Sequence, residues 1–184
     1  MSHLICRMKR ILLTSVILLL STSFYAISIE DRYVMKVVND GQLYFILPYE
    51  IPSSASRTKA AMADITYLTT TDSVTMNVSV WGKDVLKADS ILLITEDDRV
   101  VCDFQTFFIE MDGKVWLHRY SLRYPYADLC RLYISPSPFI LRIYAESKEV
   151  QYTYLAKAWK KESVWMNQIL QTIMSNKEVY NQVK

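Results

Sequence analysis

The sequence has few of the residues on which metal sites, phosphate-binding loops and disulfide scaffolds depend. Its 184 residues include two His, three Gly, three Cys and five Pro. A zinc site with several imidazole ligands, a Gly-rich phosphate loop, a fibrous repeat and a disulfide-bonded miniprotein are therefore excluded. Hydrophobic residues make up 51% of the chain and charged residues 22%, which is typical of one globular domain. We predict no metal and no cofactor.

The N-terminus has the pattern of a secretory signal peptide. Arg7, Lys9 and Arg10 give the first ten residues their positive charge, and the apolar run 11–20 follows. This run is about half as long as the roughly 20 residues that span a bilayer. The pattern therefore predicts export and not a permanent membrane anchor.

Small residues mark where the leader ends. Ser21 and Ser23 stand at positions −3 and −1 of a cleavage after residue 23, and cleavage after Ala26 is the alternative. We therefore expect a signal peptide over 1–23 and a single exported domain over 24–184, located in the periplasm, on the cell surface or outside the cell.

The net charge changes when the leader is removed. The full chain carries 21 Lys and Arg against 19 Asp and Glu, and three of the basic residues belong to the leader. The remaining domain has 18 basic and 19 acidic residues, a formal charge of −1. Without a basic surface, we expect no nucleic-acid partner.

The pattern of short strands and tight turns predicts a mainly β fold over 33–145. Two Asp-Gly pairs, at Asp40 and Asp112, lie between β-rich segments and predict hairpins. Apolar and polar residues alternate strictly over 73–81, which indicates a strand with one buried face. The full set of expected strands is 33–38, 43–47, 73–81, 91–95, 99–110, 114–122 and 139–145.

Two segments interrupt this pattern. We expect a long loop over 48–63, whereas 124–135 is compatible with either a helix or a strand. We predict β-sandwich-like antiparallel sheets followed by a long C-terminal amphipathic α-helix. The alternative is an α+β fold with the helix packed on one open sheet.

The C-terminal segment predicts an amphipathic helix over 154–175, about 30 Å long. Its apolar stripe consists of Leu155, Trp159, Met166, Ile169 and Ile173. Ser175 and Asn176 offer an end, and 177–184 is expected to be a frayed tail. The stripe suits packing on a sheet, a groove in a partner, or a membrane surface contacted through Trp159 and Trp165.

Two cysteines, Cys102 and Cys130, follow the leader. In an oxidising compartment they predict one disulfide. Both lie among apolar residues, and the alternative is two buried free thiols.

An Arg- and Tyr-rich region provides the candidate binding surface, because these residue types are enriched at recognition surfaces. Cross-strand pairing on the wet face of a sheet is the structural alternative. The candidate binding residues are Trp116, His118, Tyr120, Arg123, Tyr124 and Tyr126.

We assign no catalytic residue. His118 is the single histidine after the leader, and we expect it on a half-exposed strand. The sequence predicts a non-catalytic binding or assembly module of the cell envelope or extracellular space, with a protein or glycan partner. The alternatives are a membrane-surface protein that uses the C-terminal helix and a hydrolase that uses His118.

Overall fold

The computed structural model describes residues 29–53, 59–146 and 148–183. The chain divides into two units, Met1–Asp31 and Arg32–Lys184. The first is described only over Ile29–Asp31, in a 3₁₀ turn labelled η2 (Ile29–Arg32). The expected leader and both of its cleavage points lie outside the described residues.

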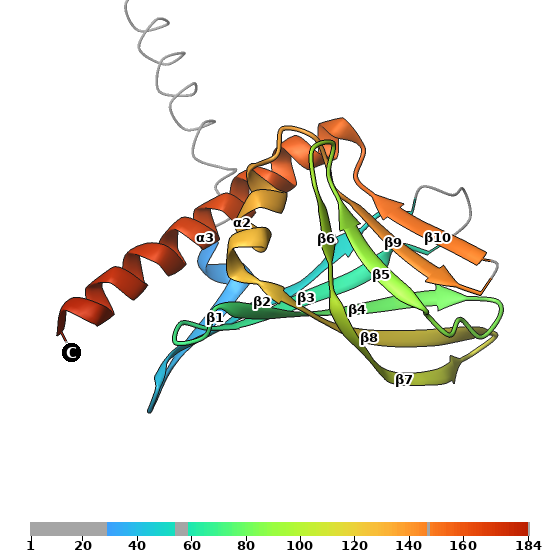
Figure 1. The fold of residues 1–184 in the computed structure, drawn as a ribbon, viewed down its shortest axis with the longest axis horizontal. Helices are drawn as coiled ribbons and strands as arrows, with labels where there is room; N and C mark the ends of the chain where they lie inside the picture. The colour runs from blue at the N-terminus through green and yellow to red at the C-terminus, as the bar shows by residue number, and fades with distance from the viewer. Residues whose placement is uncertain (1–28, 54–58, 147, 184) are drawn as a thin grey trace, which may run out of the picture. The chain divides into compact units, whose positions relative to one another are not determined.

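The second unit contains two antiparallel sheets (Figure 1). Within the described residues, the larger sheet has six strands in the order β1-β2-β3-β4-β8-β7, and the smaller has four in the order β10-β9-β5-β6. The strands of the larger sheet are β1 (Tyr33–Val38), β2 (Gly41–Ile51), β3 (Ala61–Leu68), β4 (Ser73–Gly82), β7 (Asp103–Asp112) and β8 (Val115–Pro125). Those of the smaller sheet are β5 (Ser90–Ile94), β6 (Arg99–Val101), β9 (Ile140–Ala145) and β10 (Lys148–Thr153).

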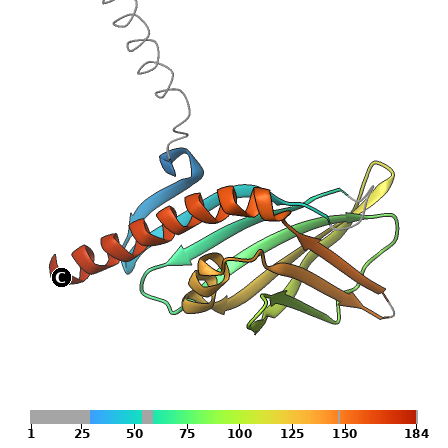
Figure 2. The same ribbon diagram turned by 90° about the horizontal axis from the view of Figure 1, so that it is seen from above.

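Two helices, α2 (Tyr126–Ile134) and α3 (Ala156–Val183), complete the unit. Figures 1 and 2 show that α3 and α2 cover one part of a face of the large sheet, while the small sheet covers another part of the same face. The predicted fold class, mainly β with a C-terminal helix packed on sheets, is confirmed.

Alternation of side chains explains why the large sheet has one buried face. On β4, every second residue from Val74 to Val80 is buried, and the residues between them are mostly half-buried. Strand β3 repeats the pattern from Ala61 to Tyr67. Since neighbouring strands are in register, these side chains form one apolar layer beneath the helices and the small sheet.

Both predicted hairpins are present. Val38 pairs with Gly41 across the turn between β1 and β2, and Asp112 pairs with Val115 between β7 and β8. Gly113 has a φ of 65°, in the left-handed region that glycine adopts without strain. Local sequence was sufficient to predict these turns.

Segment 124–135, for which the sequence allowed a helix or a strand, contains helix α2. Pro125 is its N-cap residue, and Leu129, Leu132 and Tyr133 form its buried side. The helical alternative for 124–135 is therefore the observed one.

The end predicted for the C-terminal helix was wrong, because α3 continues to Val183. The Asn176 amide donates a 2.9 Å hydrogen bond to the Tyr44 hydroxyl, and the Lys177 ammonium lies 3.4 Å from the Tyr67 hydroxyl. These contacts with the large sheet stabilise the turns expected to fray. No helix in the described part of the chain is long and apolar enough to span a membrane.

Two other expectations need correction. The loop predicted over 48–63 is partly strand, because β2 continues through Ile51 after a register shift and β3 begins at Ala61. The strand predicted over 99–110 is interrupted at Cys102, where the chain leaves the small sheet and enters the large one. Both features depend on pairing with distant strands, which local sequence does not specify.

Candidate functional site

The six candidate binding residues do not lie on one exposed surface. His118, Tyr120 and Tyr124 point from β8 into the buried layer, with exposed fractions of 0 to 2%. Arg123 is exposed, since its neighbours on the strand are the inward-facing residues. Trp116 is half-buried on β8, and Tyr126 is half-buried at the start of α2.

Hydrogen bonds give several of these tyrosines a structural role. The Tyr120 hydroxyl donates a 2.5 Å hydrogen bond to the carbonyl of Leu86, in the loop between β4 and β5. The Tyr126 hydroxyl donates to the carbonyl of Leu170 on α3 at 3.2 Å, and its ring stacks on Tyr67 with centroids 4.3 Å apart. These side chains hold loop, helix and sheet together.

The arginines of this region make cross-strand contacts. Arg119 lies 2.6 Å from the carboxylate of Asp64 on β3 and donates to the Ser79 hydroxyl on β4 at 2.7 Å. Arg123 donates to the Ser73 hydroxyl at 3.0 Å. Cross-strand pairing, the alternative to a contact surface, therefore occurs at both residues.

The expectation that His118 is half-exposed was wrong, because its ring is completely buried. The backbone N–H of Leu86 donates a 2.7 Å hydrogen bond to Nε2, which places the proton of the neutral ring on Nδ1. Burial lowers the pKa of His118, and the nearby Val80 backbone opposes part of this shift. Nδ1 has no hydrogen-bond partner of normal geometry among the described residues.

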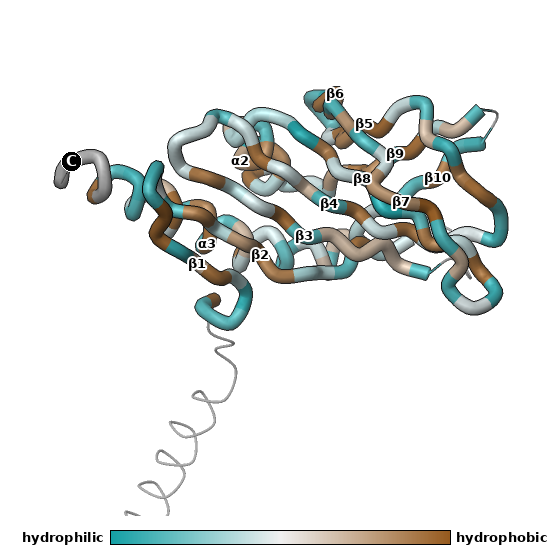
Figure 3. The backbone as a smooth tube through the Cα atoms, turned by 90° about the horizontal axis from the view of Figure 1, so that it is seen from below, coloured by the Kyte–Doolittle hydropathy of each residue, from teal (hydrophilic) through white to brown (hydrophobic). Residues whose placement is uncertain are grey.

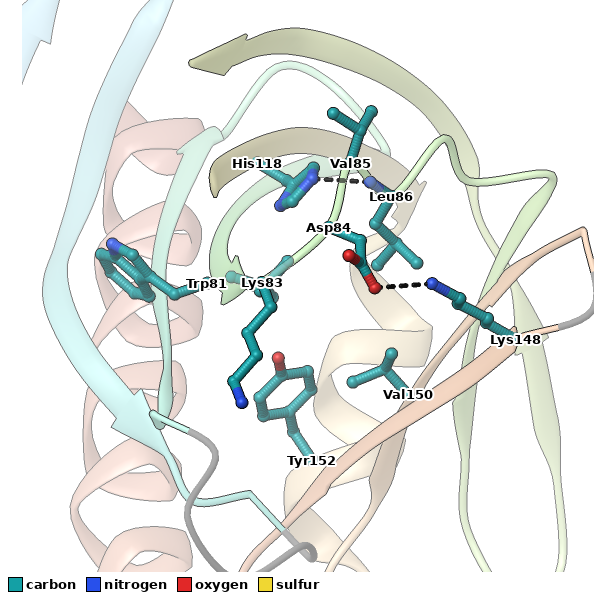
Figure 4. A pocket seen from close by; sticks show the side chains of 11 residues that line it. Trp81, Lys83, Asp84, Val85, Leu86, His118, Lys148, Val150 and Tyr152 are labelled. Carbon is teal, nitrogen blue, oxygen red and sulfur yellow. Dashed lines mark hydrogen bonds and ion pairs between the residues drawn. The ribbon is translucent and has the colours of Figure 1, made fainter. Parts of the chain in front are cut away.

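A cavity of about 200 Å³ lies beside His118, where the end of β4, the following loop and β10 meet (Figure 4). In Figure 4, Lys83, Asp84, Lys148, Val150 and Tyr152 surround the cavity, whereas the Trp81 ring points away from it. The described residues that line it include no serine, threonine or cysteine. Since Nε2 of His118 already accepts a backbone hydrogen bond, this geometry offers no nucleophile paired with a free base.

The expected disulfide is not observed, and Cys102 and Cys130 are free thiols. Cys102 is buried where the chain changes sheets, near Asp128, and burial raises the pKa of its thiol to about 12. Cys130 on α2 has Tyr126 as its hydrogen-bonded neighbour, and burial raises its pKa as well. The two thiols thus have different neighbours, and Cys102 is buried whereas Cys130 is half-buried.

Both tryptophans of the helix are buried within the fold. The Trp159 indole N–H donates to the carbonyl of Ser135 at 3.1 Å, and that of Trp165 donates to Glu162. The aromatic rings nearest to Trp159 are those of Tyr133, Phe139 and Tyr154. Neither indole is on the surface of the described unit.

Strand β1, at one edge of the large sheet, has an exposed and mostly apolar surface. Exposed side chains on both of its faces are Val34, Met35, Val37 and Val38. Figure 3 shows β1 as mostly hydrophobic. Sequence reasoning did not identify this surface, although the lack of polar alternation in 33–38 was a signal that could have revealed it.

Comparison of the chain with models of protein families, with curated proteins and with solved structures finds no match. In the described residues, no group of three or more His, Cys, Asp and Glu is arranged to hold a metal ion.

Proposed function

We propose that the chain is an exported, non-catalytic binding or assembly module of the cell envelope or extracellular space, and that it recognises a protein partner through the edge of β1. Exposure of this strand carries the proposal. An edge strand has a row of unpaired backbone groups that another extended chain can pair with. We favour a protein over a glycan because backbone pairing is specific to polypeptides.

The two edges of the large sheet differ in how they are protected. Strand β7 carries Asp103, Glu110 and Asp112, and its pairing with β8 is irregular at Phe107. Charges and bulges both disfavour pairing with another strand. Strand β1 pairs with β2 in unbroken register over its whole length, and Lys36 is its single charged residue. Of the two edges, β1 is the more suitable for strand addition.

The side chains of β1 indicate what kind of segment would fit beside it. Met35 and Val37 extend the face that carries buried Tyr44, and Val34 and Val38 lie on the opposite face. An added strand would need apolar residues on both faces to cover them. It would also carry an acidic residue near Lys36. The expected occupant is therefore an extended, mostly apolar segment of another protein with an acidic residue.

Site-specific photocrosslinking in cells tests this proposal. Val37 on β1 is 70% exposed and Val101 on β6 is 73% exposed, so they are matched positions on edge strands of different sheets. A crosslinking residue at position 37 should form an adduct that mass spectrometry maps to an extended apolar segment. The same residue at position 101 should form none.

Charge substitution provides the second part of the test. Val37→Lys should abolish the adduct formed from a probe at position 35, and Val101→Lys should leave it unchanged, with equal melting temperatures. Equal crosslinking at positions 37 and 101, or persistence of the adduct in Val37→Lys, would reject the β1 site. An adduct formed with a second copy of the chain would show that β1 mediates self-association and does not bind a different protein.

A further inference from the structure

We propose that the cavity between β4, β8 and β10 binds a small organic carboxylate. This site is separate from the β1 edge and does not depend on the function proposed for it. The residues that form it come from three distant parts of the sequence, 80–86, 118 and 148–152.

The size of the cavity limits the ligand. A volume of about 200 Å³ is smaller than the 300–1,000 Å³ typical of pockets for drug-sized ligands, but it exceeds the roughly 150 Å³ cavity known to hold benzene. Val80, Val85, Leu86 and Val150 provide apolar walls. A ligand whose apolar part is one aromatic ring or a short aliphatic chain would match this volume and these walls.

The charges around the cavity favour an anion. Lys83, Asp84 and Lys148 line it, and the Lys148 ammonium lies 2.8 Å from the Asp84 carboxylate. This pairing lowers the pKa of Asp84 and keeps the carboxylate ionised. Two positive charges against one negative charge leave a net positive charge, with Lys83 available for an anionic group of the ligand.

The Tyr152 hydroxyl provides a directional donor. Figure 4 shows it pointing into the cavity between Lys83 and Val150. The Tyr152 side chain is 1% exposed, so its hydroxyl faces the cavity from within the fold. Burial raises the pKa of Tyr152 to about 12, so the hydroxyl keeps its proton at neutral pH. A carboxylate that accepts this hydrogen bond beside Lys83 satisfies both groups.

The inner end of the cavity adds no further charge. His118 is fully buried there, and its lowered pKa keeps the ring neutral near pH 7. An apolar body with a single anionic end, directed toward Lys83 and Tyr152, therefore fits the site better than a dianion or a cation.

Titration calorimetry with benzoate and benzamide tests the proposal on the purified full chain. The two compounds have nearly the same shape, but only benzoate is charged. Benzoate should bind, and benzamide should bind at least about tenfold more weakly, a difference of about 1.4 kcal/mol. Equal binding of both compounds would overturn the carboxylate requirement. Absence of heat with both benzoate and hexanoate at about 10 mM would overturn the site itself.

Variants locate the binding. Lys83→Gln should weaken benzoate binding by about tenfold or more without lowering the melting temperature. Lys157→Gln changes an exposed lysine on α3 and is the matched control. Tyr152→Phe removes only the hydroxyl and should also weaken binding, whereas Val150→Trp should fill the cavity and abolish it. Unchanged affinity in both Lys83→Gln and Tyr152→Phe would place the ligand elsewhere.

Discussion

Several buried tyrosines of this protein have specific hydrogen-bond partners within the core. The Tyr133 hydroxyl donates to the Tyr49 hydroxyl at 2.8 Å, and the Tyr154 hydroxyl donates to the carbonyl of Glu50 at 2.7 Å. A tyrosine hydroxyl satisfied in this way can be buried at little cost. This explains why an Arg- and Tyr-rich composition, which also suits a recognition surface, occurs here largely as internal packing and cross-strand pairing.

His118 makes stability depend on pH in a predictable direction. Burial lowers its pKa in the folded state, so the unfolded chain binds a proton that the folded chain does not. The free energy of unfolding should therefore fall as the pH decreases below the usual value of about 6.5. Because His118 takes up at most one proton, it can change the free energy of unfolding by at most about 1.4 kcal/mol per pH unit.

Urea unfolding between pH 7 and pH 5 measures this contribution. His118→Gln keeps a side-chain acceptor for the Leu86 N–H but has no titrating ring, so its unfolding free energy should change less over this range. Since His3 belongs to the expected leader, no other histidine titrates in the remaining chain. Equal pH slopes for the wild type and His118→Gln would contradict the prediction.

The elements differ in how far local sequence determines them. The hairpins β1–β2 and β7–β8 were predicted because each depends on an Asp-Gly turn between β-rich segments. The change of sheet at Cys102 was not, since it depends on Val101 pairing with Leu92 while Asp103 pairs with Arg123. The cavity was missed for the same reason, because its walls come together only when β10 lies beside the loop after β4.

The last turns of α3 should depend in part on the contact of Asn176 with the large sheet. Asn176→Ala removes the hydrogen bond to the Tyr44 hydroxyl and should cost about 1 kcal/mol, since this hydroxyl loses its donor and keeps only the bond that it donates to Gln42. Hydrogen exchange of the backbone amides after Ser175 should become faster. Gln171→Ala, at an exposed position of the same helix, is the control. Unchanged exchange in Asn176→Ala would mean that other contacts hold these turns.

At the scale of the whole second unit, the two sheets are connected by the chain and by hydrogen bonds. The Thr153 N–H, at the end of β10, donates to the carbonyl of Pro52 at 2.9 Å, and Tyr152 forms an isolated bridge with Ser53. The chain also passes between the sheets at Cys102. The apolar face of each sheet is covered by the other sheet or by the helices. We therefore expect the two sheets to unfold together.

Leu93→Ala tests this cooperativity. Leu93 is completely buried on β5 of the small sheet, so its truncation should cost about 2–4 kcal/mol. The four tryptophans that report unfolding by fluorescence all lie outside that sheet, at positions 81, 116, 159 and 165. Fluorescence and far-ultraviolet circular dichroism should nevertheless shift to the same lower urea midpoint. Val101→Ala changes an exposed position of the same sheet. It should alter the free energy of unfolding reported by either probe by less than about 0.5 kcal/mol. A fluorescence midpoint that stays at the wild-type value in Leu93→Ala would show that the small sheet unfolds on its own.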